Sequence, residues 1–228
     1  MDKAPTQVRR IGPTRRSVSG RYAFRGTSSV PYESTLERDF VVRQEFRRCV
    51  LDVVAQPVTI HWRDDTGRAR TYTPDYLVLF RADEIRRVGG PPSLLVEVKH
   101  REDLRRDWAA LRPKFRAAVR HARAQGWRFS IQDEYAIRDQ VFDNITFLKR
   151  YERMQFSAED KRAVLDRIEF MGQSPIDYLV AVQASGPIFK PQAIALVWHL
   201  LATRQLDCDM CLPLDQFTVV WRSQHGPA

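Results

Sequence analysis

The sequence predicts an α/β or α+β domain with a mixed sheet, followed by a smaller domain that is mostly helical. In the first two thirds of the chain, segments with helical spacing of apolar residues alternate with segments of strand spacing. The last third contains three helical patterns and two short strand patterns. Of the 228 residues, 43% are hydrophobic and 11% aromatic. This is enough to build a core, so we exclude a chain that is disordered throughout.

We expect three regions along the chain: an arm over residues 1–30, a first domain over 31–154 and a second domain over 155–228. The arm is rich in arginine and broken up by glycine and proline, so it should be extended with little packing of its own. The elements expected in the first domain are a helix over 33–51, strands over 58–62, 72–80 and 94–98, a helix over 101–125, a strand over 127–132 and a helix over 140–152.

Two of these segments have informative details. The strand over 94–98 is almost continuously apolar, as a strand buried on both faces would be, and Glu97 interrupts it. The helix over 101–125 has an apolar residue every three or four positions. We expect Pro113 to split or kink this helix, and Gly126 to end it as a C-cap.

The second domain has a different pattern. Ser157 should cap a helix over 158–170, and Ser174 should cap a helix over 174–184 with Pro175 at its first position. A third helix is expected over 192–203. Short strands over 206–208 and 217–221 could pair as a hairpin. Three helices and a two-stranded wing are the pattern of a winged-helix domain.

The charge of +9 is unevenly distributed, with an excess of +6 in residues 1–30, +6 in residues 100–128 and −2 in residues 155–228. The two basic blocks favour a polyanionic partner such as double-stranded DNA, because each neutralised phosphate releases condensed counterions. A solubilising tail and a solvated helix face are the alternative interpretation. The change of sign indicates that residues 155–228 have a different partner.

Membrane and disulfide classes are disfavoured. No apolar run approaches the roughly 18 residues of a membrane helix, so we expect no membrane partner. Three cysteines rule out a disulfide scaffold and suit a reducing compartment. Cys208 and Cys211 form a Cys-x-x-Cys pair, but zinc usually needs a second close pair. We interpret these two cysteines as incidental.

The candidate catalytic residues lie on two neighbouring strands. Pro74-Asp75 is near the start of one strand, and Glu97-Val98-Lys99 ends the next. Alternation places Glu97 and Lys99 on one face, and pairing of the strands would bring Asp75 alongside. Adjacent carboxylates repel unless a cation lies between them, and Mg²⁺ prefers such hard oxygen ligands. Lys99 would stabilise the charge that develops during hydrolysis of a phosphodiester.

A third carboxylate could come from the first helix. Glu33 and Glu37 are four residues apart and so share a helix face. Acidic residues also favour the first turn of a helix because of the macrodipole, which would explain them without any catalytic role. With a helix starting at Glu33, Glu37 would lie just beyond that turn, so this explanation suits Glu33 better.

The combination of Pro-Asp on one strand and Glu-x-Lys on the next resembles the PD-(D/E)xK nuclease superfamily. At family level, the ordered blocks YESTLERDF, AQPVTI, YTPDYLVLF and LLVEVK resemble the TnsA family, the endonuclease subunit of Tn-seven-like heteromeric transposases. The stretches PKFRAAVRHARAQGWRF and IRDQVFDNITFLKRY are similar to the same family, so the likeness covers roughly residues 15–225.

The resemblance implies a restriction-endonuclease-like fold and assigns the site. Glu37, Asp75 and Glu97 would be the acidic metal ligands and Lys99 the catalytic lysine, and the carbonyl of Val98 would be a further ligand. Mg²⁺ would be the cofactor, with Mn²⁺ as a substitute. Gln56 matches the QP block of the family and would lie near the site. His100 departs from the family pattern, in which many members have proline.

The resemblance also implies a reaction and partners. Members of the family cut the 5′ ends of a transposon, while a DDE transposase acts at the 3′ ends and an AAA+ ATPase regulates both. We expect the ATPase to contact residues 155–228, and we expect the chain in the bacterial cytoplasm. Two alternatives are a stand-alone restriction or repair nuclease of the same superfamily, and a non-catalytic DNA-binding assembly module.

Overall fold

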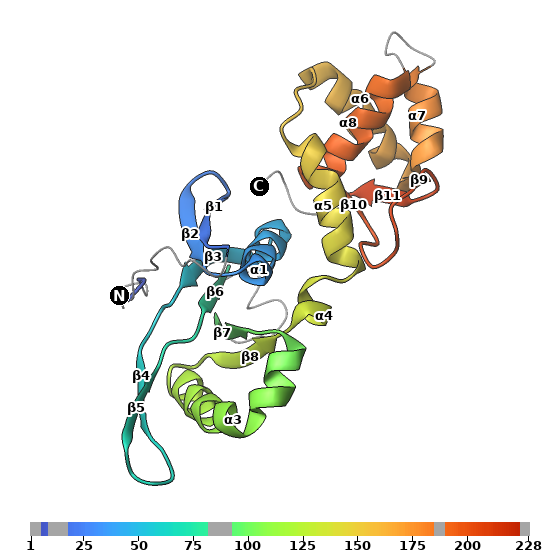
Figure 1. The fold of residues 1–228 in the computed structure, drawn as a ribbon. Helices are drawn as coiled ribbons and strands as arrows, with labels where there is room; N and C mark the ends of the chain where they lie inside the picture. Colours follow the sequence, from blue (N-terminus) through green and yellow to red (C-terminus); the bar gives the residue numbers. More distant parts are fainter. Residues whose placement is uncertain (1–5, 9–17, 82–92, 185–189, 224–228) are drawn as a thin grey trace. The chain divides into compact units, whose positions relative to one another are not determined.

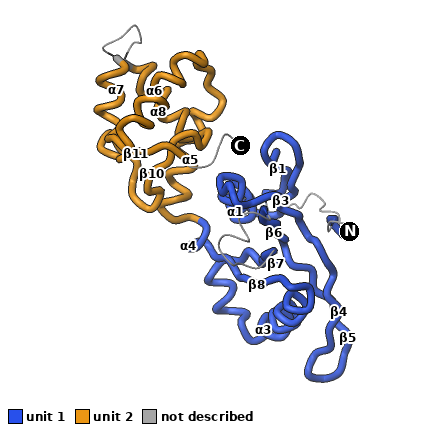
Figure 2. Tube along the Cα trace, turned by 180° about the vertical axis from the view of Figure 1, so that it is seen from behind, with its two compact units in different colours: residues 1–137 blue, residues 138–228 orange. Residues whose placement is uncertain are grey.

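The structure, a computed structural model, describes residues 6–8, 18–81, 93–184 and 190–223 (Figure 1). The chain divides into two compact units, residues 1–137 and 138–228 (Figure 2). The first unit is built around a four-stranded mixed sheet and the second around helices with a small sheet. Among the described residues, no helix combines the length and the apolar character that crossing a membrane requires.

The main sheet has the strand order β3-β6-β7-β8. Its strands are β3 (Val50–Ala55), β6 (Tyr76–Phe80), β7 (Ser93–Val98) and β8 (Arg128–Gln132). Strands β3, β6 and β7 pair antiparallel, whereas β7 and β8 pair parallel. The parallel pair requires a crossover, which the long helix α3 (Arg101–Ala124) supplies. The predicted mixed sheet is confirmed.

One helix packs on each face of this sheet (Figure 1). Helix α1 (Thr35–Phe46) contributes Leu36 and Phe40 to the core with Tyr76 and Val96. Helix α3 forms the core of the other face with Leu77, Leu95 and residues of β8. Alternation explains the division, because successive strand residues point to opposite faces. This α/β layering agrees with the restriction-endonuclease-like fold class.

Helix α1 is shorter than the predicted helix over 33–51, and strand β3 was missed. Ser34 caps α1 by accepting the N–H of Glu37, and the helix ends at Phe46. Phe46 and Val50 fit helical spacing, which misled the prediction. The valines of β3 are better suited to a strand, where Val50 and Val53 are buried in the core.

The strand predicted over 72–80 is interrupted. Strand β5 (Ala69–Tyr72) pairs with β4 (Ile60–Arg63) in a separate hairpin, and β6 begins only at Tyr76. Pro74 lies between them and has no N–H with which to continue a ladder. Asp75 therefore lies in the connection, directly before the first residue of β6.

Part of the expected arm is folded. Strands β1 (Gly20–Phe24) and β2 (Ser28–Tyr32) form an antiparallel hairpin, with Phe24 and Val30 buried in the same core as α1. The expectation of little packing is therefore wrong for this segment. The arginine pairs at 9–10 and 15–16 lie outside the described residues.

Helix α3 is not split at Pro113 but continues from Arg101 to Ala124. Residues on both sides of the proline, Leu111 and Phe115 among them, pack on the sheet and hold the two halves in line. Gly126 has a positive φ of 70° after the helix, as its predicted role at the C-terminus requires. The short helix α4 (Glu134–Ile137) follows β8.

The second unit begins earlier than the expected domain boundary at residue 154/155. Helix α5 (Gln140–Glu152) packs on α8 (Lys190–Ala202), where the rings of Phe147 and Trp198 have centroids 5.0 Å apart. The carbonyl of Tyr151 lies 3.0 Å from Nδ1 of His199 on α8. These contacts make α5 part of the helical unit.

The rest of this unit comprises α6 (Ala158–Met171), β9 (Gln173–Pro175), α7 (Ile176–Ala184), β10 (Leu206–Cys208) and β11 (Val219–Arg222). The predicted pairing of the last two strands is observed, and Ser157 caps α6 as expected. Ser174 and Pro175 do not start a helix but form β9, which pairs with β11. The order of the elements is that of a winged helix, which stays a prediction.

Candidate active site

The Pro-Asp motif lies directly before β6 and the Glu-x-Lys motif at the end of β7, and these two strands are called the motif strands below. The motifs meet where β6 begins and β7 ends. Tyr76 pairs with Val96 in the antiparallel register, so one step further Asp75 faces Glu97. Glu97 contacts Lys114 of α3 and therefore lies on the α3 face of the sheet, and its charge acts on Asp75. The role of the two carboxylates as a joint metal site stays a prediction.

Asp75 is held by the backbone of its neighbours. Its Oδ2 accepts the N–H of Val98 at 2.7 Å, and its carbonyl accepts the N–H of Gln56 at 2.7 Å. Burial raises the pKa of Asp75 well above its ordinary value, and the charges of Glu97 and Glu37 raise it further. The site thus concentrates more negative charge than its own hydrogen bonds offset.

Glu97 is only 6% exposed, and both of its oxygens have partners. Oε2 accepts the hydroxyl of Tyr72 at 2.6 Å, and Oε1 accepts Nζ of Lys114 at 2.9 Å. The pKa of Tyr72 is raised by burial and then by Glu97, so its phenol stays protonated and donates. A glutamate in an otherwise apolar strand is therefore paired on both sides, as a buried charge requires.

Sequence reasoning missed Tyr72 and did not single out Lys114 among the basic residues of the helix. A signal for Lys114 was present. It lies three residues after Leu111 and four before Ala118, both of which face the sheet. No comparable signal marked Tyr72, because its partner is 25 residues away in sequence.

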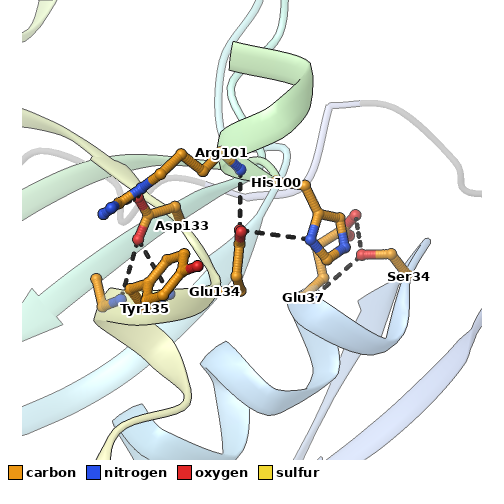
Figure 3. Close-up of polar contacts among 8 residues, drawn as sticks. Ser34, Glu37, His100, Arg101, Asp133, Glu134 and Tyr135 are labelled. Atoms are coloured by element: carbon orange, nitrogen blue, oxygen red, sulfur yellow. Dashed lines mark hydrogen bonds and ion pairs between the residues drawn. The ribbon is translucent and has the colours of Figure 1, made fainter. Parts of the chain in front are cut away.

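Glu37 has a clear structural role in α1. Its Oε1 accepts the hydroxyl of Ser34 at 3.0 Å, and its own N–H donates to Ser34 (Figure 3). Its Oε2 accepts the N–H of Glu33 at 2.8 Å. The arrangement differs from a capping box in that the carboxylate accepts the N–H of Glu33 and not that of the N-cap residue Ser34. Because α1 starts at Thr35, Glu37 lies within the first turn and not beyond it, so that part of the sequence argument is wrong.

Glu37 is nevertheless connected to the motif strands. Its Oε2 also accepts the hydroxyl of Tyr76 at 3.3 Å, and Tyr76 directly follows Asp75. Burial is the main reason that the pKa of Glu37 is raised. Since the charge of Glu37 acts on Asp75, the three predicted acids form one electrostatic group.

Lys99 and Val98 complete the predicted set. The N–H of Lys99 donates to the carbonyl of Gln132 at 3.0 Å, which continues the pairing of β7 with β8. The pKa of Asp107 on α3 is lowered mainly by its hydrogen bond from Arg106 and also by the charge of Lys99. The side chain of Val98 is buried in the core with α1, and its N–H is used by Asp75.

His100 and Arg101, which follow Lys99, contact Asp133 and Glu134 beyond the end of β8 (Figure 3). Glu134 accepts the N–H of Arg101 at 2.9 Å and lies 3.4 Å from Nδ1 of His100. The Arg101 side chain donates to Asp133 at 2.7 Å. The start of α3 is thus anchored to the connection between β8 and α4, so Lys99 is held between two fixed segments.

Gln56 is close to Asp75, as expected. It directly follows β3, has a positive φ of 46°, and is only 4% exposed. Its side-chain Oε1 is buried without a hydrogen-bond partner among the described residues. A non-glycine residue with this φ is uncommon, and its backbone is bonded on both sides, by its N–H to the carbonyl of Asp75 and by its carbonyl to the N–H of Val8.

The donor chemistry fits a hard divalent cation at Asp75 and Glu97. Mg²⁺ is commonly held by one or two carboxylates, with water and phosphate oxygens completing the shell. Across the described residues, no group of three or more His, Cys, Asp or Glu side chains is arranged to hold a metal. Ligation by Glu37 as a third acid stays a prediction.

Family models match both units. Residues 47–134 match the model described as TnsA-like endonuclease N terminal, and residues 136–210 match the model described as TnsA endonuclease C terminal. The chain belongs to the TnsA endonuclease family. Its transposition-related nuclease character follows from these two domains, and the resemblance stated from the sequence is confirmed.

The TnsA-like N-terminal match covers most of the predicted site residues. Asp75, Glu97 and Lys99 lie within the N-terminal endonuclease match, whereas Glu37 precedes it. The two matches meet at residues 134–136, next to the boundary between the compact units. No curated protein matches the chain.

Proposed function

We propose that this TnsA family member is a Mg²⁺-dependent DNA endonuclease that cuts the 5′ ends of a transposon. The observation that supports the proposal is the contact of Asp75 with the end of β7, where its carboxylate accepts the N–H of Val98 next to Glu97, within the residues that match the TnsA-like endonuclease model. Two neighbouring acids, of which Glu97 is buried, cost free energy unless a cation lies close to them. A bound metal ion would offset that cost.

Asp75 and Glu97 would hold the ion, and the carbonyl of Val98 would be a further ligand. When bound, the ion supplies polarisation of the scissile phosphate and a water of lowered pKa. Lys99 shares a face with Glu97 and would stabilise the charge on the phosphate oxygens. The hydrogen bond from Val98 fixes Asp75, and that from Tyr72 fixes Glu97, so neither carboxylate needs to reorganise.

Glu37 is the third proposed acid. Its charge acts on Asp75, and Tyr76 joins it to the same strand end. Both of its oxygens already accept hydrogen bonds at the start of α1, from the N–H of Glu33 and the hydroxyl of Ser34, so direct ligation would compete with these bonds. Its contribution is therefore separable from that of Asp75 and Glu97 by mutation.

The proposed partners are a DDE transposase, which acts at the 3′ ends, and an AAA+ ATPase regulator. The ATPase contact is proposed for the winged-helix domain, which we place within residues 155–228, where the net charge is −2 and DNA binding is disfavoured. Hydrogen exchange of the full chain with and without the ATPase should protect residues 158–222. Protection confined to residues 1–137 would contradict this placement. We also propose the bacterial cytoplasm as the compartment.

The test of the reaction uses end-labelled transposon DNA with the transposase, the ATPase and Mg²⁺. Asp75→Asn and Glu97→Gln should abolish cutting at the 5′ ends, while Glu102→Gln, an exposed acid on α3, should leave it unchanged. Cutting that persists in both site variants would disprove the proposal. Cutting by the chain alone would favour the stand-alone nuclease, and a chain that binds no Mn²⁺ would favour the non-catalytic module.

A further inference from the structure

A cation from α3 already lies at the proposed metal site. Nζ of Lys114 is 2.9 Å from Oε1 of Glu97, and the two side chains are 23% and 7% exposed. Nζ also lies 4.5 Å from the ring centre of Tyr72 and 5.1 Å from that of Phe115. The ammonium is thus placed by an ion pair and two aromatic faces, in an environment that is largely shielded from water.

This placement neutralises the site from within the protein. Lys114 pairs with one oxygen of Glu97, while Tyr72 donates to the other oxygen. Without such a cation, Glu97 would be a buried charge with a single neutral donor.

The same placement conflicts with a bound divalent ion. A metal on the Asp75–Glu97 pair would lie a few ångströms from the ammonium, and like charges at that distance repel. The long, flexible lysine stem allows Nζ to move away while its methylene groups stay on the aromatic rings. The ion pair to Glu97 is then the contact that must be given up.

We propose that Lys114 is a built-in counter-cation of the carboxylate pair, which stabilises the metal-free fold and competes with the divalent ion for Glu97. The first half of the inference concerns the metal-free protein alone. The second half rests on the proposed function, because it assumes that Asp75 and Glu97 bind a metal. The two halves have separate measurements.

The first measurement is thermal unfolding of the full chain in EDTA. Lys114→Met keeps the length of the stem but removes the charge, and it should lower the Tm by about 5 °C. In the Glu97→Gln background the same substitution should not lower the Tm, because the carboxylate with which Lys114 pairs is absent. Arg116→Met, an exposed position two residues further along α3, is the control. An equal loss of Tm in both backgrounds would overturn the ion pair as the source of stability.

The second measurement is calorimetric titration with Mn²⁺, without DNA. Lys114→Met should bind Mn²⁺ about tenfold more tightly than the wild type, and Lys114→Arg should not. Unchanged or weaker binding by Lys114→Met, with a wild type that binds, would overturn the competition and leave the proposed function intact. If neither protein binds Mn²⁺, the proposed metal site fails and the competition fails with it.

Discussion

The carboxylate of Asp75 accepts the backbone N–H of Val98, so a side chain before β6 ends the ladder of β7. One residue thus closes the junction of the two motif strands and carries one of the proposed ligand charges. Stability of the fold and metal binding favour different side chains at this position. An uncharged acceptor would suit the junction better, whereas a metal requires the charge.

Replacement of Asp75 by asparagine separates these demands. The amide oxygen can still accept the N–H of Val98, but the repulsion with Glu97 and Glu37 is removed. We expect Asp75→Asn to raise the free energy of unfolding by about 1–3 kcal/mol at pH 7 without metal. Calorimetric titration should show that Mn²⁺ binding is lost. A less stable Asp75→Asn protein would contradict the electrostatic account, and Asp75→Ala, which also loses the hydrogen bond, is the comparison.

The pKa of Asp75 also predicts a dependence on pH. Because this pKa is raised in the folded protein above its ordinary value of 3.8, folding takes up a proton between the two values. The stability linked to Asp75 is present below pH 3.8 and is lost as the pH rises through the higher, folded value. Urea unfolding in EDTA should show that the advantage of Asp75→Asn over the wild type grows from about pH 4 upward. An advantage that is constant with pH would rule this out.

Glu37 has two possible contributions, which three variants distinguish. Ser34→Ala removes the cap and the hydrogen bond from Ser34 to Oε1 of Glu37 but leaves the carboxylate, and it should cost about 1 kcal/mol of stability with cutting retained. Glu37→Gln keeps an acceptor oxygen for the N–H of Glu33 and should lose little stability. If Glu37 serves the metal, Glu37→Gln and Glu37→Ala should both abolish cutting at the 5′ ends. Normal cutting by Glu37→Gln would reduce Glu37 to its structural role.

Tyr72 is expected to stabilise the fold through its hydrogen bond to Glu97. Tyr72→Phe keeps the ring beneath Lys114 but removes the hydroxyl that lies 2.6 Å from Oε2. We expect a loss of about 1.5–3 kcal/mol, the range of a hydrogen bond to a charged group, measured by urea unfolding. Tyr135→Phe, at a ring that is 65% exposed, should change nothing. The loss should shrink in the Glu97→Gln background, and a loss of the same size there would point to a packing defect.

The site residues on the motif strands could be predicted because charged side chains interrupt the apolar strand pattern. Glu97 stands in an apolar strand, and Asp75 follows a proline that breaks a strand. How β6 and β7 are aligned depends on their pairing in the folded sheet, so the proximity of the two residues could only be an expectation from the sequence. The α/β class followed in the same way from the alternation of the two periodicities.

Other features depended on tertiary contacts that no local pattern shows. Strand β3 has residues that fit a helix, and only its pairing with β6 decides the matter. Pro113 indicated a break in α3, but packing on the sheet keeps the helix continuous. The partner of Lys114 is 17 residues away on another element, so the ion pair was not visible in the sequence.

The most direct test of the account is a crystal structure of the full chain soaked with Mn²⁺, with the anomalous signal recorded. The account predicts a peak about 2.2 Å from one oxygen of Asp75 and one of Glu97, with Nζ of Lys114 withdrawn from Glu97. A structure in which no ion binds between these two carboxylates, or in which the ion is bound elsewhere in the chain, would contradict it.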